Sequence, residues 1–322
     1  MAFAADTYSL VADIGGTNTR VALAEGPRVL TDTIKRYSNA EFPGLEAVLR
    51  RYLDDTGDID FAGACAAVAG PVHDGCASMT NLDWTLDRET LARATRAENV
   101  ALLNDLQAQG HALDHIAPEN IAEVVINHDR NPRAAELVVG VGTGFNCCPV
   151  FRTDTGRYVP PSEAGHINLP IRTEADLRLC GFVETAHGFP SIEDVLSGRG
   201  LERVYAWLGE EAGDPRPASA TQIMAGMIDD SDPRAAQAVE VFVRLLGTVV
   251  GNLALIHLPF GGIYLIGGVA RAMQPYLGRF GFEQALRDKG RFSQFMGNFG
   301  VSIVEDDYAA LTGCACHLDG LA

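Results

Sequence analysis

Lysine is nearly absent from this chain, with only Lys35 and Lys289 among 322 residues. Arginine therefore carries almost all of the positive charge, and 42 acidic residues against 25 basic ones give a formal net charge of −17. Nucleic acids and anionic membrane surfaces bind proteins through clustered positive charge. The composition thus indicates that neither is a partner, and that any anionic ligand is held by backbone amides, arginine or a metal ion.

Cysteine pairing motifs, an export signal and a long apolar run are also missing. The seven cysteines form no Cys-x-x-Cys motif, and their odd number indicates reduced thiols in a cytoplasmic protein. Residues 1–5 are too short and uncharged for a signal peptide. The longest apolar stretch, 245–260, is interrupted by Gly, Asn and His, so no membrane span is predicted.

The chain lacks the Gly-x-x-x-x-Gly-Lys-[Ser/Thr] phosphate loop, but two other glycine-rich turns are present. The first, residues 13–18, reads Asp-Ile-Gly-Gly-Thr-Asn, and the second is Gly142-Thr143-Gly144. Both lie between apolar runs and predict β-hairpins. The first is expected to have positive φ at Gly15 and Gly16, and its backbone amides could approach a phosphate. A plain turn is the structural alternative.

Length and periodicity predict an α/β protein with two lobes, because 322 residues are many for one core. Meandering strands come first, then buried strands that alternate with helices, and a second hairpin followed by helical periodicity over 173–258. Helix N-caps are predicted at Thr173 and Ser191. The other expected elements are strands at 28–37, 61–69, 100–103, 263–266 and 301–304, and helices at 42–52, at 87–96 and from 308.

Polar residues gather where the apolar strands end, and ligands of open α/β sheets bind at such ends. Asp13 is predicted to hold Mg²⁺ through water, because magnesium takes one or two carboxylates and keeps several waters. Asp105, which follows Asn104 at another strand end, is predicted to accept the proton of an attacking hydroxyl. Capping a helix or closing a turn is the structural alternative for each aspartate.

Six motifs in the same order resemble the bacterial ATP-dependent glucokinases of the hexokinase/actin-like ATPase superfamily. These motifs are Asp13 to Asn18, Leu103-Asn104-Asp105, Gly142-Thr143-Gly144, Glu163-Ala-Gly-His166, Glu193 to Gly198, and Gly267-Gly268. The resemblance covers residues 8 to about 317.

The resemblance implies a two-lobed, ribonuclease H-like fold with the active-site cleft between a small and a large domain. The small α/β domain would comprise 1–115 plus 306–322, and the large α/β domain 116–305. The implied activity is transfer of the γ-phosphoryl group of Mg-ATP to the 6-hydroxyl of glucose, in a cytoplasmic homodimer. The implied nucleotide-binding residues are Asp13, Gly15, Gly16, Thr17, Asn18, Gly142, Thr143, Gly144, Gly267 and Gly268.

The resemblance also assigns the sugar site. Asp105 is implied as the catalytic base, and the implied glucose ligands are Asn104, Asp105, Glu163, His166, Glu193 and Asn81. Carboxylates with Asn and His can satisfy the donors and acceptors of a ring of sugar hydroxyls. The structural alternative for Glu193 is an acid in the first turn of a helix.

The second glycine-rich turn departs from the family pattern, which usually continues Gly-Thr-Gly-Leu-Gly. Here the turn runs Gly144-Phe145-Asn146. Asn tolerates positive φ better than most residues, so the turn is expected to survive and Asn146→Gly to leave activity similar or higher. Three alternatives to ATP-dependent glucose phosphorylation stay open. The acceptor could be another hexose, the donor could be polyphosphate, or the protein could be a sugar sensor that has lost catalysis.

Overall fold

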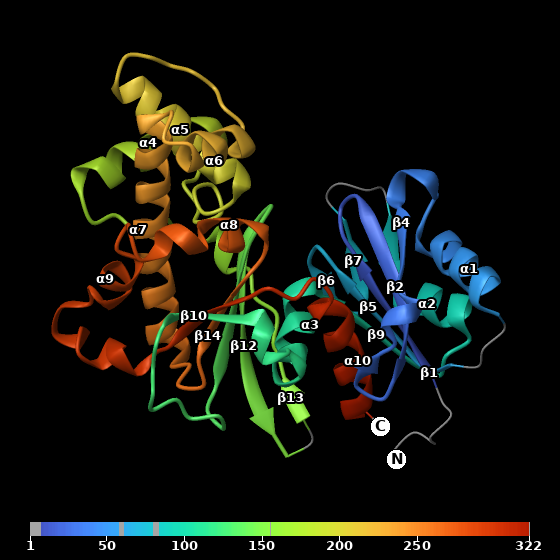
Figure 1. The fold of residues 1–322 in the computed structure, drawn as a ribbon. Coiled ribbons are helices and arrows are strands. Elements are labelled where there is room, and N and C mark those ends of the chain that lie inside the picture. The colour runs from blue at the N-terminus through green and yellow to red at the C-terminus, as the bar shows by residue number, and fades with distance from the viewer. Residues whose placement is uncertain (1–7, 58–60, 80–83, 155, 322) are drawn as a thin grey trace. The chain divides into compact units, whose positions relative to one another are not determined.

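Two segments distant in the sequence complete the first of two structural units (Figure 1): residues 150–161 and 306–322 join residues 1–117. The second unit comprises 118–149 and 162–305. The computed structural model describes residues 8–57, 61–79, 84–154 and 156–321. Segment 150–161 lies in the first unit, although the sequence expectation placed it in the large domain.

The first unit is built on a sheet of order β3-β2-β1-β5-β9, with β4 also paired to β2. β1, β5 and β9 are parallel, and β2 runs antiparallel to β1. The elements are β1 (Tyr8–Ile14), β2 (Asn18–Glu25), β3 (Arg28–Val29), β4 (Lys35–Ser38), α1 (Leu45–Thr56), β5 (Phe61–Val68), β6 (Val72–His73), β7 (Cys76–Ser78), β8 (Thr85–Asp87), α2 (Arg88–Thr95), β9 (Asn99–Asn104), α3 (Asp105–Ala112), β13 (Gly156–Tyr158) and α10 (Ala309–Leu321).

Helices cover both faces of this sheet. Along β1, Leu10, Ala12 and Ile14 join one apolar cluster with α1 and α2. Val11 points to the opposite face and joins a second cluster with α3 and α10. The strand is therefore buried on both sides, as parallel strands of α/β proteins are, and this explains its continuous apolar run.

The second unit contains a sheet of order β10-β15-β14-β11-β12, and β12 continues into the first unit, where it pairs with β13. The elements are β10 (Ile121–Val125), β11 (Glu136–Val141), β12 (Phe145–Thr153), α4 (Glu174–His187), α5 (Gly198–Glu211), α6 (Ala220–Ile228), α7 (Pro233–His257), β14 (Ile263–Ile266), α8 (Gly268–Leu277), α9 (Phe282–Arg287) and β15 (Val301–Val304). These elements confirm the predicted α/β class.

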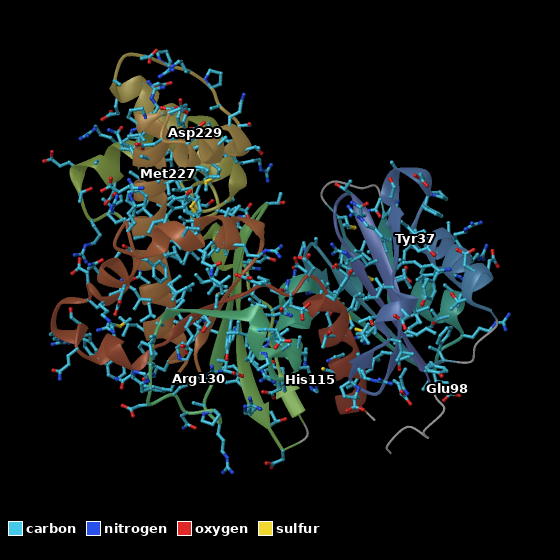
Figure 2. All side chains as sticks on the ribbon, viewed as in Figure 1. Tyr37, Glu98, His115, Arg130, Met227 and Asp229 are labelled. Atoms are coloured by element: carbon cyan, nitrogen blue, oxygen red, sulfur yellow. The ribbon has the colours of Figure 1, made fainter. Side chains whose placement is uncertain are left out.

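Helix α7 is the central element of the second unit and packs against α5, α6, α8 and α9. Among the described residues it is the one helix long and apolar enough to cross a membrane, but 67% of its most apolar window is buried in the protein. Figure 2 shows the side chains of the neighbouring helices packed around it, among them Met227 of α6. The apolar composition of α7 thus serves the core.

Two sequence predictions about local structure are wrong. The strand expected at 28–37 is interrupted at Thr33, whose hydroxyl accepts from Leu23 N and donates to Leu30 O, so local side-chain bonds replace strand pairing. Ser191 does not cap a helix. Its hydroxyl bonds the Asp194 carboxylate across a turn, and α5 begins later, capped by Ser197. The cap predicted at Thr173 is confirmed.

The contact between α3 and α10 gives a stability prediction. A Cβ added to Gly313 of α10 would collide with the backbone carbonyl of Ala108 on α3. We expect Gly313→Ala to lower the stability by about 1–3 kcal/mol, the usual cost of overpacking a core. Thermal unfolding measures this. Gly181→Ala is the matched control, because open space surrounds Gly181 in α4 and alanine favours helix there. Equal melting temperatures for both variants would contradict the close packing.

Candidate active site

The first glycine-rich turn joins β1 to β2, and the predicted hairpin is confirmed. Asp13 lies directly opposite Arg20 in the antiparallel register. Arg20 Nη1 donates to Asp13 Oδ2 over 2.9 Å, and the Asp13 side chain is 17% exposed. Asp13 is therefore an ion-paired residue within a strand and neither caps a helix nor closes a turn.

The tip of this hairpin is held by Asn39, which is buried. Asn39 Nδ2 donates to Gly15 O over 2.7 Å, and its Oδ1 accepts from the Thr19 hydroxyl. Gly16 and Thr17 are left exposed. The expected positive φ at Gly15 and Gly16 is wrong, because neither is among the described glycines in the left-handed region.

Asp105 is placed by the junction between β9 and α3. Asn104 is the N-cap of α3: its Oδ1 accepts from Leu106 N, and Gln107 completes a capping box. Asn104 Nδ2 also donates to Gly70 O over 3.0 Å, which fixes the loop that follows β5. The cap of α3 is thus Asn104 and not Asp105, which is the first helical residue.

The two strand-end aspartates of the first unit, Asp13 and Asp105, influence each other electrostatically. Burial raises the pKa of Asp105 to about 6, and the negative charge of Asp13 adds to the rise. Burial also raises the pKa of Asp13, although the hydrogen bond and charge of Arg20 oppose it. A carboxyl whose pKa lies near neutrality is suited to accept a proton during catalysis.

The donor set around Asp13 fits magnesium. Magnesium is usually held by one or two carboxylates, water and the phosphates of the substrate, rather than by a cage of protein ligands. No cluster of three His, Cys, Asp or Glu that could hold a metal occurs among the described residues. The burial that raises the pKa of Asp13 would be offset by a cation beside its carboxylate.

The second glycine-rich turn joins β11 to β12 in the second unit. Gly142 N donates to Gly144 O, and Gly142 O accepts from Gly198 N at the start of α5, each over 2.9 Å. Gly267, which has φ +111°, caps α8 so close to Val141 O that a Cβ would collide with it. The N-termini of α5 and α8 therefore lie beside this turn, and such ends favour phosphate.

The predicted sugar ligands of the second unit lie on neighbouring segments. Glu163 and His166 are exposed, with Glu163 Oε2 and His166 Nε2 3.8 Å apart. Glu193 N donates to Gly165 O between them, over 2.9 Å. Since the next helix begins only at Gly198, the interpretation of Glu193 as a first-turn acid is wrong.

Glu193 also reaches the second glycine-rich turn. Its Oε2 accepts from Phe145 N over 2.9 Å, and the carboxylate lies where a Cβ on Gly144 would be. The structure thus brings Glu163, His166, Glu193 and Gly144 together within one unit. Asn81, the remaining predicted ligand, lies outside the described residues.

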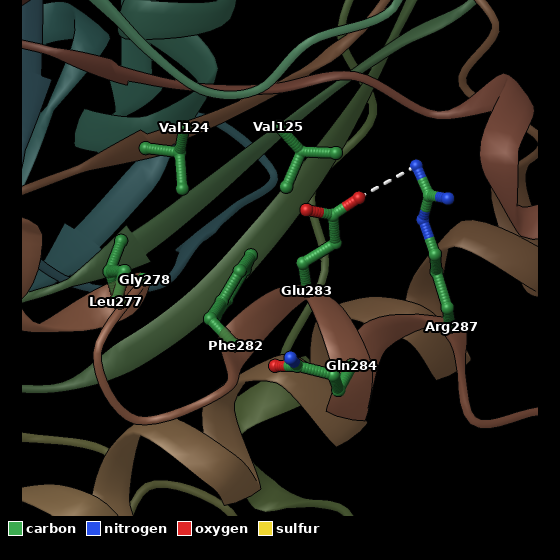
Figure 3. Close-up of a pocket in the computed structure, with 8 residues that line it drawn as sticks. All are labelled: Val124, Val125, Leu277, Gly278, Phe282, Glu283, Gln284 and Arg287. Carbon is green, nitrogen blue, oxygen red and sulfur yellow. Dashed lines mark ion pairs between the residues drawn. The ribbon is translucent and has the colours of Figure 1, made fainter.

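A cavity of about 320 Å³ in the second unit lies apart from these residues (Figure 3). Apolar side chains of β10, α8 and α9 form much of its wall. Glu283 and Arg287 also line it and form an ion pair, with 2.7 Å between Glu283 Oε1 and Arg287 Nη2. None of the predicted site residues lines it. The candidate site is therefore defined by the turns and strand ends, not by this cavity.

Sequence reasoning missed Arg20 and Asn39. Arg20 could have been found, because a hairpin centred between residues 16 and 17 places residue 20 opposite Asp13. Asn39 gave no signal: its partner Gly15 lies far away in sequence, and an isolated Asn before a helix is common.

Comparisons with solved structures agree with this arrangement. A glucokinase from an Antarctic psychrotroph superposes with a TM-score of 0.85 at 29% identity, covering 97% of this chain and 98% of that one. A ROK family glucokinase from Streptomyces griseus, solved with glucose and AMPPNP, shares the fold with a TM-score of 0.64 at 18% identity, over 97% and 98% of the two chains. The fold is that of a sugar kinase with the actin-like ATPase fold.

Sequence comparison narrows this class to one family. Residues 10–321 match the family model described as Glucokinase. The glucokinase of Saccharophagus degradans is 31% identical over 316 residues, which cover 97% of this chain and 98% of that protein. The chain belongs to the glucokinase family.

Proposed function

We propose that this glucokinase-family enzyme transfers the γ-phosphoryl group of ATP, as its magnesium complex, to the 6-hydroxyl of glucose. The products are glucose 6-phosphate and ADP. Family membership supports the reaction, and the S. griseus relative was solved with glucose and AMPPNP. The observation that carries the mechanism is the half-buried Asp105 carboxyl at a strand end, with its pKa raised to about 6.

Asp105 accepts the proton of the 6-hydroxyl as the sugar oxygen bonds to the γ-phosphorus and the bond to ADP breaks. Leu106 N donates to Asp105 Oδ1 over 2.9 Å, which fixes the carboxyl at the start of α3 and leaves Oδ2 to face the hydroxyl. Asn104, Glu163, His166, Glu193 and Asn81 bind the other sugar hydroxyls.

The two glycine-rich turns hold the nucleotide through backbone amides and hydroxyls, since neither contains a lysine. Their residues are Gly15, Gly16, Thr17, Asn18, Gly142, Thr143 and Gly144, with Gly267 and Gly268 at the adenosine. Asp13 would hold Mg²⁺ through water, and the bound ion would neutralise charge on the phosphates. Arg20 keeps the Asp13 carboxylate oriented.

A coupled assay with ATP and a panel of hexoses tests this function. We expect glucose to be phosphorylated with a higher kcat/KM than mannose or fructose. The comparisons do not favour another hexose as substrate or a catalytically impaired sensor. Polyphosphate in place of ATP tests the donor, and no phosphorylation of any hexose with either donor would contradict the proposal.

The pH dependence of kcat/KM should report the protonation of Asp105. Only the carboxylate accepts a proton, and burial together with the charge of Asp13 raises its pKa to about 6. We therefore expect kcat/KM to rise with pH through about 6 and to level off above 7. A profile that stays flat between pH 5 and 8 would contradict Asp105 as the base.

We also propose a cytoplasmic homodimer. The seven cysteines, all within the described residues, form no disulfide bond, which supports a reducing compartment. Light scattering tests the oligomeric state against the chain mass of 34.4 kDa.

A further inference from the structure

Asn146, the residue that departs from the family pattern of the second glycine-rich turn, does not serve that turn alone. It lies on β12, and its Oδ1 accepts from Cys147 N over 2.8 Å, from Ala164 N over 3.0 Å and from Ser162 Oγ over 3.2 Å. Its Nδ2 donates to Ser162 O. Three of the four hydrogen bonds thus go to residues 162 and 164, which flank Glu163.

Glu163 depends on these flanking bonds for its position. Its side chain makes no capping hydrogen bond to the short helix Ala164–His166 and is 55% exposed. The backbone on either side therefore fixes the point from which the side chain extends, and its carboxylate lies 3.8 Å from His166 Nε2. Asn146 holds that backbone at both neighbours of Glu163. The Ser162 hydroxyl shares its single proton between Asn146 Oδ1 at 3.2 Å and Cys147 O at 2.7 Å.

Glu193 also links the second glycine-rich turn to the segment that contains Glu163. Its backbone N donates to Gly165 O, and its Oε2 accepts from Phe145 N, both over 2.9 Å. Gly165 packs against Phe145 O so closely that any Cβ there would collide with that oxygen. We call residues 162–166 the sugar loop. The side chains of Asn146 and Glu193, together with the close contact of Gly165 with Phe145 O, therefore hold the sugar loop against residues 142–146.

We propose that Asn146 is a positioning residue for glucose: it fixes the sugar loop so that Glu163 meets a sugar hydroxyl. The inference rests on the proposed function, which makes Glu163 a glucose ligand. Although Asn146 falls within a nucleotide-binding motif, its effect is on the sugar. Glycine, which the family usually has at this position, would remove all four side-chain bonds. The expectation that Asn146→Gly is neutral is therefore replaced by an expected loss of glucose affinity.

Calorimetry with glucose alone, followed by steady-state kinetics, tests this inference on three variants of the full chain. Asn146→Gly should raise the glucose Kd and KM about tenfold, which corresponds to about 1.4 kcal/mol, because the four lost bonds order the sugar loop but do not themselves contact glucose. The ATP KM should change less than about twofold. Asn146→Asp keeps the acceptor oxygen but not the bond to Ser162 O, so it should weaken glucose binding less than Asn146→Gly.

Asn127→Gly is the matched control. Asn127 also makes two hydrogen bonds between its side chain and the backbone, to Asn298 O and Asp129 N, in an exposed part of the second unit. We expect it to alter thermal stability at most and to leave glucose binding unchanged. An effect on glucose binding as large as that of Asn146→Gly would overturn the inference.

Two results on Asn146→Gly would also overturn the inference. One is a raised ATP KM with unchanged glucose binding, which would assign Asn146 to the nucleotide. The other is a lower melting temperature with both KM values unchanged, which would make it a structural residue only.

If the wild type binds glucose but does not phosphorylate it, the proposed function fails, and the Kd comparison still decides the role of Asn146. If the wild type binds no hexose, both fail.

Discussion

Asp105→Asn is expected to reduce kcat by about 10²–10⁴-fold, the range that general-base catalysis contributes. The amide keeps the size of the side chain and its place at the start of α3 but does not accept a proton. Leu106 N donates to Oδ1, and an amide oxygen in its place can still accept that bond, although more weakly than a carboxylate. Glucose binding measured by calorimetry should therefore stay within a few-fold of the wild type.

Asp32→Asn is the matched control for this substitution. Asp32 is an exposed aspartate of the same unit, in the first turn of the short 3₁₀-helix Thr31–Thr33. Its variant should turn over at the rate of the wild type. If Asp105→Asn also retains its rate, another group takes the proton and the proposed mechanism is wrong.

Glu193→Ala should impair both substrates, whereas Glu163→Ala should impair glucose alone. Both lose a sugar ligand, and a site built to bond a hydroxyl loses much affinity when its partner is removed. Glu193→Ala also leaves Phe145 N without its acceptor beside the nucleotide turn. An unsatisfied buried amide costs about 1–3 kcal/mol, so we expect the ATP KM to rise about tenfold or more.

His166→Ala should raise the glucose KM less than either glutamate variant, because bonds to a neutral imidazole are weaker than those to a carboxylate. Glu184→Ala, which removes an exposed acid of α4, is the control for all three. A Glu163 variant that binds glucose normally but melts several degrees lower would place the sugar site elsewhere. A Glu193 variant with an unchanged ATP KM would show that Phe145 N finds another acceptor.

The strands and their polar ends could be predicted from the sequence because they depend on local patterns. The apolar run before Asp13 is continuous since helices cover both faces of its sheet. Asp13 is the next-to-last residue of β1, and Asp105 directly follows β9, so both were correctly placed at strand ends.

The connections within the site could not be predicted, because they join residues that are close only in the folded chain. Asn39 bonds Gly15, Asn146 bonds Ser162 and Glu193 bonds Phe145, each across an intervening strand, loop or helix. The sequence showed Asn146 only as an irregularity of a turn. The proposed role of Asn146 depends on the folded chain, in which β12 and the sugar loop lie side by side.

The place of α10 in the chain has a consequence for biosynthesis. α10 packs on β1, on β5 and on α3, which carries Asp105, yet it is translated after the entire second unit. While a ribosome is still making residues 118–305, the sheet that bears Asp13 has one apolar face covered only in part, by α3 and not yet by α10. Domains usually fold from the N-terminus as they emerge. Here the first unit begins to be synthesised before the second unit but is completed after it. Nascent chains halted before residue 309 should therefore expose to chaperones the sheet face that α10 covers.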